Sequence, residues 1–494
     1  MSICDGAHSH ASGFAMRRTA SGFAAAGAAL VAAVVLVGFG AVAIGRTGPS
    51  AVSEAIPFAP NVRVTDRSSP LPHQVEPYLV VDPLGRLIIG WKEALTDDGP
   101  GFWVGFAHSE DGGRTWSPNA VMALANPGRH QSDPWLTVDE RNRTYYARLE
   151  YSGDESTVSV SRSDDGGRAW GPISSADDRP GFADKESIAS DGAGSLYVVY
   201  DDVVGNDTEV RFTRSTDAGA SWSPTVSVTD AVGAALGPVV ASSGDGNSYV
   251  AWWNLTDGNI MVDRSGDRGT TWGTDIRVNS IAGSVRSDSG NRAFPSLPSI
   301  AIDSRGRVFV AWADRGGGDL NIAVARSDDS GRTWTRPARV SDDLSGREQW
   351  MPALAVDRSD RIHAAWMDNR TGNLNVFYAN STDGGETWSP NVRVTTAETP
   401  SSFHRPGDYL GLAVDANGTA YLAWTDGREG NLDIYFARNP GASVATTTPP
   451  AQSSLDAVGI VVLVVGTAVP AVVLALLLRR GRRPPETPGG RPPP

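Results

Sequence analysis

Seven segments of this chain open in a similar way, and the side chains at their openings differ in chemistry. Four of the opening residues are ionisable (Glu76, Asp133, Lys185 and Tyr409), and three are not (Gly237, Leu297 and Met351). Ionisable groups that share one cavity can exchange protons with a substrate or hold a polar ligand. Whether these four groups meet depends on the elements that carry them.

The same residues also have ordinary structural explanations. An acidic residue directly before a proline, as at positions 76 and 133, starts a strand well. Lys185 lies between Asp184 and Glu186, which is typical of an internal salt bridge. Both interpretations remain open at this point.

Residue types that bind metals are sparse. Cys4 is the only cysteine, so no disulfide, thiol nucleophile or cysteine metal site is expected in the folded region. His130 and His404 lack spaced partners. The Asp- and Gly-rich loops 368–373 and 426–431 could offer oxygen ligands to Ca²⁺, although turn chemistry explains them equally well. We therefore expect no cofactor and no metal, with Ca²⁺ as the open alternative.

One eight-residue segment occurs six times, first as Ser109–Trp116, with the pattern Ser-x-Asp-x-Gly-x-x-Trp. Its Asp residues are Asp111, Asp165, Asp217, Asp267, Asp329 and Asp383, and successive Trp residues lie 54, 52, 50, 62 and 54 positions apart. Such a period indicates one repeated supersecondary unit. Asp and Ser can bond the backbone of a tight turn, Gly permits the turn conformation, and Trp packs it. These Asp residues are predicted to be structural.

Four short strands of alternating polarity accompany each repeat, and seven such units fill residues 61–440. The seventh unit ends near Arg438 with three strands and no copy of the segment. Asn61–Thr65 duplicates Asn391–Thr395, the fourth strand of the sixth unit. We therefore predict an all-β propeller of about seven four-stranded blades, in which the first strand completes the last blade. Six blades, one for each copy of the segment, is the alternative.

The repeated segment resembles the Asp-box, or bacterial neuraminidase repeat, of the sialidase superfamily. The resemblance covers about 380 residues, 61–440, and implies a propeller. Enzymes of that superfamily have six blades and place Arg-Ile-Pro at the first inner strand, where the arginine joins two others to hold a substrate carboxylate. In this chain the matching stretch is Gln74-Val75-Glu76-Pro77, so the arginine is missing.

The resemblance also implies a mechanism, in which a Tyr nucleophile is polarised by a Glu and an Asp is the acid/base. The matching residues are Tyr409, Glu76 and Asp133, which lie in neighbouring blades of the predicted ring. Candidate ligand-binding residues are Lys185, Asp408 and two loop arginines that could reach the channel, Arg347 and Arg405; Arg286 and Arg292 lie in comparable loops.

The two ends of the chain predict export and a membrane anchor. Residues 1–46 carry a twin arginine, an apolar run and an Ala-x-Ala site, as in a signal peptide or a retained signal anchor. A linker, 47–60, precedes the propeller, and a stalk, 441–456, follows it. Residues 457–478 are uncharged and long enough to cross a bilayer. Four arginines open the Pro-rich tail 479–494, which places the tail in the cytoplasm and the propeller outside.

The charge composition of the chain limits the classes of partner that it can bind. The chain has 43 basic and 56 acidic residues and a formal net charge of −13, which argues against nucleic acid. Only two of the basic residues are lysines, Lys92 and Lys185. Two functions stay open. One is a membrane-anchored propeller that binds a glycan or an envelope protein without catalysis, and the other is an exo-sialidase-type glycoside hydrolase.

Overall fold

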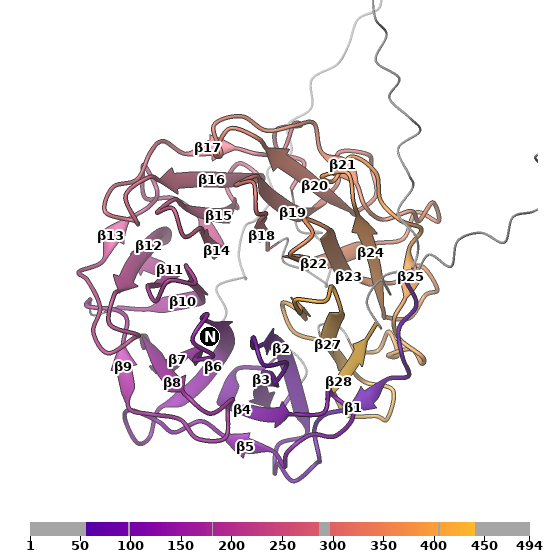
Figure 1. Ribbon diagram of the computed structural model, residues 1–494, viewed down its shortest axis with the longest axis horizontal. Coiled ribbons are helices and arrows are strands. Elements are labelled where there is room, and N and C mark those ends of the chain that lie inside the picture. The colour runs from indigo at the N-terminus through magenta and orange to yellow at the C-terminus, as the bar shows by residue number, and fades with distance from the viewer. Residues whose placement is uncertain (1–55, 97–98, 180, 286–296, 404–405, 440–494) are drawn as a thin grey trace, which may run out of the picture. The chain divides into compact units, whose positions relative to one another are not determined.

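The computed structural model describes residues 56–96, 99–179, 181–285, 297–403 and 406–439. Within these ranges 28 strands form seven four-stranded antiparallel sheets, arranged as a ring around a central channel (Figure 1). The prediction of an all-β propeller with seven blades is confirmed, and the six-blade alternative is wrong. None of the described segments forms a helix able to cross a membrane, and the predicted signal segment 1–46 and membrane helix 457–478 lie outside the described residues.

The blades follow one another along the chain, and within each blade the strands run in order from the channel outward. Blade 1 is β2 (His73–Val81), β3 (Leu87–Ala94), β4 (Gly101–Ser109) and β5 (Ala120–Val121); blade 2 is β6 (His130–Val138), β7 (Thr144–Ser152), β8 (Glu155–Ser163) and β9 (Ile173–Ser175). Blade 3 is β10 (Ala183–Ser190), β11 (Leu196–Val204), β12 (Asp207–Ser215) and β13 (Val226–Ser227); blade 4 is β14 (Ala235–Ser242), β15 (Ser248–Asn254), β16 (Asn259–Ser265) and β17 (Ile276–Arg277). Blade 5 is β18 (Ser299–Ile302), β19 (Val308–Asp314), β20 (Asn321–Ser327) and β21 (Ala338–Arg339); blade 6 is β22 (Gln349–Val356), β23 (Ile362–Asp368), β24 (Asn375–Ser381) and β25 (Val392–Arg393). Blade 7 is β26 (Gly411–Val414), β27 (Ala420–Asp426), β28 (Asp433–Arg438) and β1 (Val62–Arg63).

Blade 7 closes the ring with the first strand of the chain, as the duplicated segment predicted. Strand β1 pairs with β28, and Val62 lies opposite Phe436. The side-chain amide of Asn61 donates to the carbonyl of Val394 at 2.9 Å, just as its repeat partner Asn391 donates to Val340 at 3.0 Å. The duplicated asparagine thus fastens β1 and β25 to the blade that precedes each of them.

Tryptophan recurs in the second strands because its ring and its N–H are both satisfied there. Four fully buried indoles donate Nε1–H to a carboxylate two residues later: Trp91 to Glu93 at 3.1 Å, Trp312 to Asp314 at 2.7 Å, Trp366 to Asp368 at 3.1 Å and Trp424 to Asp426 at 2.8 Å. Blade 2 has Arg148 and Glu150 at these two positions, as the pairing of β6 with β7 shows. The side chains of Arg148 and Glu150 are completely buried, 3.3 Å apart.

Each Asp-box is the turn between the third and fourth strands of its blade. The Asp111 carboxylate accepts bonds from the Arg114 amide at 2.9 Å and the Thr115 amide at 3.0 Å, and from the Ser109 hydroxyl at 2.9 Å. Slight burial raises the pKa of Asp111, but these hydrogen bonds outweigh it and lower the pKa to about 2. The other five box carboxylates also accept bonds from their own turns: Asp165, Asp217, Asp267, Asp329 and Asp383. All six are occupied locally, away from the inner strand openings.

The glycine at the fifth position of each Asp-box packs against the preceding blade. Substitution of one of these glycines tests how much the contact contributes to stability. Gly269 has φ +76°, and a Cβ atom there would lie 2.1 Å from the Phe212 ring. Gly306 has the same φ, but a Cβ atom there would meet nothing within 4 Å. Gly306→Ala is expected to cost about 1–2 kcal/mol for the left-handed backbone alone. Gly269→Ala should cost about 1–3 kcal/mol more because it overpacks the interface.

Urea unfolding of the full chain checks this, because all 15 tryptophans lie in the propeller and report on it by fluorescence. Equal losses of unfolding free energy in the two variants would contradict the packing role of Gly269.

Candidate functional site

The inner strands of five blades contain an irregularity at the channel. The pairing with the second strand shifts between Val75 and Tyr78, Ser132 and Trp135, Asp184 and Ser187, Leu236 and Val239, and Trp350 and Ala353. A residue with positive φ lies in each bulge: Glu76 (55°), Asp133 (50°), Lys185 (50°), Gly237 (61°) and Met351 (52°). A side chain in this conformation costs on the order of 1–2 kcal/mol. Four blades therefore hold a strained residue at the channel, where bulges re-aim side chains.

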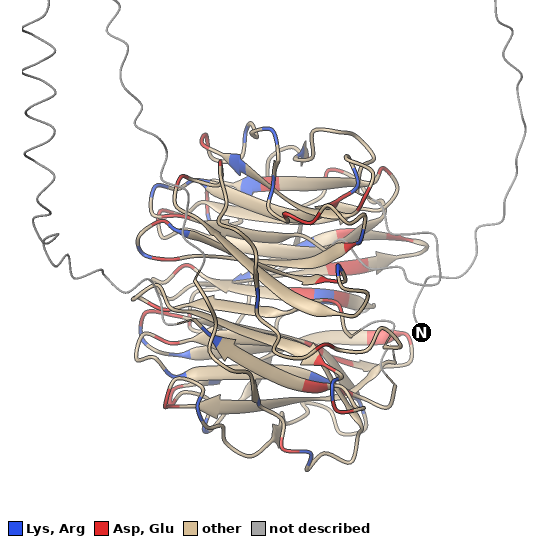
Figure 2. Ribbon diagram, turned by 90° about the vertical axis from the view of Figure 1, so that its right-hand side faces the viewer, with Lys and Arg blue, Asp and Glu red and all other residues tan. Residues whose placement is uncertain are grey.

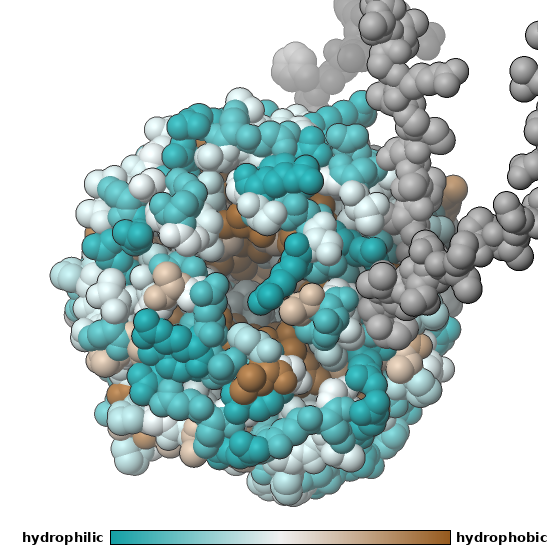
Figure 3. Space-filling model, in the orientation of Figure 1, coloured by the Kyte–Doolittle hydropathy of each residue, from teal (hydrophilic) through white to brown (hydrophobic). Residues whose placement is uncertain are grey.

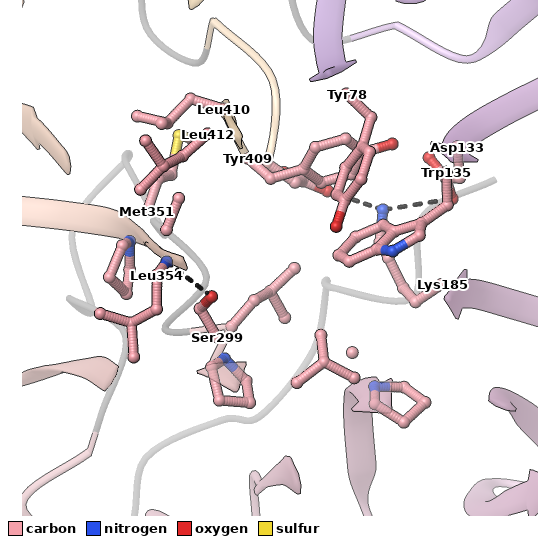
Figure 4. A pocket seen from close by; sticks show the side chains of 18 of the residues that line it. Tyr78, Asp133, Trp135, Lys185, Ser299, Met351, Leu354, Tyr409, Leu410 and Leu412 are labelled. Carbon is pink, nitrogen blue, oxygen red and sulfur yellow. Dashed lines mark hydrogen bonds and ion pairs between the residues drawn. The ribbon is translucent and has the colours of Figure 1, made fainter. Parts of the chain in front are cut away.

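These bulges surround a cavity in the channel (Figure 4), at the hollow that Figure 3 shows in the middle of one face. One side of its wall is polar and aromatic: Tyr78, Asp133, Trp135, Lys185, Glu186, Asp408 and Tyr409. The other side is largely apolar and includes Val239, Leu297, Met351, Leu354, Leu410 and Leu412. The cavity volume is about 60 Å³, on a scale where one water needs roughly 10–15 Å³. A single small group of a ligand fits inside.

Lys185 joins three blades on the polar side. Its Nζ lies 2.7 Å from Oδ2 of Asp408 and 3.4 Å from Oδ2 of Asp133 (Figure 4). Burial favours the neutral amine, but the Asp133 and Asp408 carboxylates raise the pKa of Lys185 well above its usual value. Burial likewise opposes ionisation of Asp133, but the ammonium groups of Lys185 and Lys92 lower its pKa to about 2. Lys185 and Asp133 are therefore both charged at neutral pH.

A second ion pair lies beside the first. Lys92 Nζ donates to Oε1 of Glu76 at 2.7 Å, while Oε2 of Glu76 is buried with no partner among the described residues. Burial raises the pKa of Glu76 to about 7, more than Lys92 lowers it. Neither oxygen of the buried Glu186 has a described partner, and burial raises the pKa of its carboxyl well above normal. Both lysines of the chain thus belong to one cluster with an excess of carboxyl groups.

Three aromatic rings complete the polar side. The Tyr78 and Trp135 ring centroids are 4.2 Å apart, and Tyr409 approaches Trp135 at 5.4 Å. The Tyr409 hydroxyl donates to the carbonyl of Pro134 at 3.2 Å. Burial and the nearby carboxylates raise the pKa of Tyr409 well above its usual range. Its phenol therefore keeps its proton and shares it with a backbone carbonyl.

Four of the predicted site residues line this cavity: Asp133, Lys185, Asp408 and Tyr409. Glu76 is not part of the wall; it interacts electrostatically with Asp133 and Asp408 and is paired with Lys92. Arg347 is exposed in the loop before β22 and is not part of the cavity wall. Arg405 lies outside the described residues, as do Arg286, Arg292 and His404. His130 is exposed at the start of β6. No arginine occurs among the described residues of the wall.

The loops weighed as Ca²⁺ ligands use their leading carboxylates differently. Asp368 accepts bonds from Arg370 at 2.8 Å and from Trp366, and Asp426 accepts from Arg428 at 2.6 Å and from Trp424. Over the described ranges no group of three or more His, Cys, Asp or Glu residues is arranged to hold a metal ion. Figure 2 shows acidic and basic residues interspersed over the loops of both faces.

Sequence reasoning missed three residues of this site, and each had a signal. Lys92 is one of only two lysines in a chain that otherwise uses arginine. Tyr78 and Trp135 occupy the same repeat position, two residues after Glu76 and Asp133. A bulky aromatic residue at that position of two neighbouring blades predicts contact between their rings across the blade interface.

Comparisons with known proteins found resemblance at the level of structure only. No family model matches the chain, and no curated protein matches it. Similar solved structures include a Dyadobacter fermentans protein of unknown function, at 14% identity over 78% of this chain and 98% of that one, with a TM-score of 0.48. A Penicillium chrysogenum α-L-arabinanase matches at 13% identity over 77% and 98% (TM-score 0.45), and a Trypanosoma rangeli sialidase at 14% over 68% and 59% (TM-score 0.45). At these values the likeness is one of fold alone.

Proposed function

We propose that this protein is a membrane-anchored, extracytoplasmic propeller that binds a glycan at the mouth of its central channel without hydrolysing it. The cavity wall carries this proposal, because it sets three aromatic rings beside carboxylates and has no arginine among its described residues. Aromatic faces pack on the apolar face of a sugar ring, and carboxylates accept hydrogen bonds from sugar hydroxyls. The small cavity admits one group of a sugar that lies at the channel mouth, and it does not suit a protein surface.

The ends of the chain support the location. Residues 457–478 are uncharged over 22 positions, enough for a bilayer, and four arginines follow directly. The twin arginine and apolar run near the N-terminus support export. The propeller between them would be held at the outer surface by a single C-terminal span.

Two observations argue against sialidase chemistry at this site. A tyrosine nucleophile needs an adjacent base or a lowered pKa, whereas the Tyr409 hydroxyl donates to the Pro134 carbonyl and has a raised pKa. An anionic sugar needs cationic partners, whereas Lys92 and Lys185 are already engaged by carboxylates. The described part of the site therefore has neither an activated tyrosine nor a cation available for the carboxylate of a sialic acid.

A hydrolysis assay tests the absence of catalysis. The full chain, purified in detergent, is offered fluorogenic sialosides and neutral glycosides, beside its Tyr409→Phe variant. We expect no turnover above the enzyme-free rate from either protein. Sialoside turnover that disappears in Tyr409→Phe, with an unchanged unfolding midpoint, would establish an active hydrolase and overturn the proposal.

A glycan array and titrations followed by tryptophan fluorescence test the binding. We expect saturable binding of at least one glycan, and a loss of about tenfold or more in affinity for Trp135→Leu, which removes the central ring of the wall. A folded protein that binds no glycan, or whose glycan binding is unaffected by Trp135→Leu, would refute a channel site for sugars.

A further inference from the structure

The channel holds more carboxyl groups than cations. Five buried or half-buried carboxyl groups interact with one another there: Glu76, Asp133, Asp184, Glu186 and Asp408. Lys92 and Lys185 lie among them, and the buried Arg148, which is paired with Glu150, also interacts with Glu186. Lys185 is taken by Asp133 and Asp408, and Lys92 by one oxygen of Glu76. The cluster therefore has capacity for further positive charge.

Part of that capacity is visible as unsatisfied atoms. Both oxygens of Glu186 and Oε2 of Glu76 are buried and have no hydrogen-bond partner among the described residues. Buried carboxyl oxygens in folded proteins are normally bonded, so each exception needs an explanation. Glu186 belongs to the cavity wall, which places an unpartnered carboxyl beside the space a ligand would fill.

The aromatic wall favours the same kind of ligand. The faces of Tyr78, Trp135 and Tyr409 carry negative charge density, which attracts a cation within about 6 Å of a ring centroid. Figure 4 shows these rings on the side of the cavity that also holds Asp133 and Lys185. The facing wall is aliphatic and excludes water from the cavity. The attraction between a cation and an aromatic ring is stronger where water is excluded. An ammonium group can donate hydrogen bonds to the unpartnered carboxyl oxygens, whereas an acidic sugar would add a further anion to the cluster.

We infer that the ligand of the channel carries a protonated amino group, as a sugar with an unacetylated amine does, seated between the acidic cluster and the aromatic wall. This inference rests on the proposed glycan binding and adds the charge of the sugar. An organic ammonium ion fits better than a metal ion, since no group of three or more metal-binding side chains in the described segments has a suitable arrangement.

Two oligosaccharides of the same length and linkage test the inference, a chitosan tetramer with free amines and its fully N-acetylated counterpart. With the full chain in detergent at neutral pH, we expect the amine form to bind at least tenfold more tightly by calorimetry, as for one charge-assisted contact. The Asp133→Asn variant should lose at least tenfold in affinity for the amine form and keep its affinity for the acetylated form. Asparagine accepts the left-handed backbone of this position, and Lys185 keeps Asp408 as a partner; the unfolding midpoint, measured in parallel, shows that the variant is folded.

A matched control separates this site from general attraction to an acidic protein. Asp207 is exposed at the first position of β12, and Asp207→Asn changes the net charge by the same amount. It should leave both affinities unchanged. Equal weakening by Asp207→Asn and Asp133→Asn would overturn the inference.

The remaining outcomes distinguish the two proposals. If the acetylated tetramer binds as tightly as the amine form, glycan binding stands and the cationic ligand is refuted. If benzyltrimethylammonium binds in a manner that depends on Asp133 while no glycan binds, the preference for cations stands and the glycan is refuted.

Discussion

Lys185→Met is expected to lower the free energy of unfolding by about 3–5 kcal/mol, the usual cost of removing one partner from a buried ionic cluster. Methionine keeps most of the length of the side chain but removes the ammonium group that bridges Asp133 of blade 2 and Asp408 of blade 7. These carboxylates are only 4% and 2% exposed, so water cannot replace the lost partner. The bridge also links blades that are distant in sequence, and its loss loosens the ring at its centre.

The pH dependence of this loss provides a second readout. In the native protein the pKa of Asp133 is about 2, so its ion pair stabilises the fold above the ordinary pKa of Asp and is lost only in strong acid. Without Lys185 the pKa of Asp133 should rise above its ordinary value. Protonation then relieves the penalty, and the variant should recover stability as the pH falls through that raised value.

Urea unfolding of the full chain at neutral pH and at about pH 4 measures both effects. The double variant Lys185→Met/Asp133→Asn should regain part of the loss at neutral pH, because one of the stranded charges is gone. A loss below about 1 kcal/mol, or a loss of equal size at both pH values, would show that the bridge contributes little.

Arg148→Leu is expected to lower the free energy of unfolding by about 3 kcal/mol or more, because it also removes one partner of a buried ion pair, here in blade 2. Arg148 and Glu150 are completely buried in blade 2, and Arg148 also donates to the Ala123 carbonyl at 2.8 Å. Leucine fills much of the space but leaves Glu150 with only backbone amides, those of Ala125 and Asn126, among the described residues. A buried carboxylate without its cation is the costly species.

Arg148→Trp is the matched comparison. In blades 1, 5, 6 and 7 a tryptophan at this position donates its N–H to the carboxylate two residues later. The same bond to Glu150 should recover most of the stability that Arg148→Leu loses, as measured by urea unfolding. If both variants are equally unstable, the second-strand Trp–carboxylate pair does not transfer between blades.

The fold was predictable because its signals are local and repeated. The box at Ser109–Trp116 specifies a turn from a few neighbouring residues, and six copies specify the ring. Closure was predictable from Asn61–Thr65, since a strand that copies Asn391–Thr395 makes the same contacts with its neighbour.

The site was only partly predictable, because it depends on how separate strands meet. Position in the repeat was enough to bring Glu76, Asp133 and Tyr409 to one channel. The pairing of Lys92 with Glu76 depends on the register between β2 and β3, and the bulges on irregular pairing, neither of which a sequence pattern encodes. Arg347 shows the limit for loops, whose paths are set by tertiary contacts that spacing does not reveal.

The pairing of β1 with β28 in blade 7 also affects the order in which the blades can form during folding. Strand β1 is made first, yet its partner β28 emerges only after nearly the whole repeat region, since Val62 pairs with Phe436. The other six blades are each built from consecutive strands and can form as they appear, because local contacts are faster to establish than distant ones. We therefore expect ring closure to be the last step of folding. Until it occurs, the edges of β1 and β28 are unpaired and exposed to other chains, which favours aggregation.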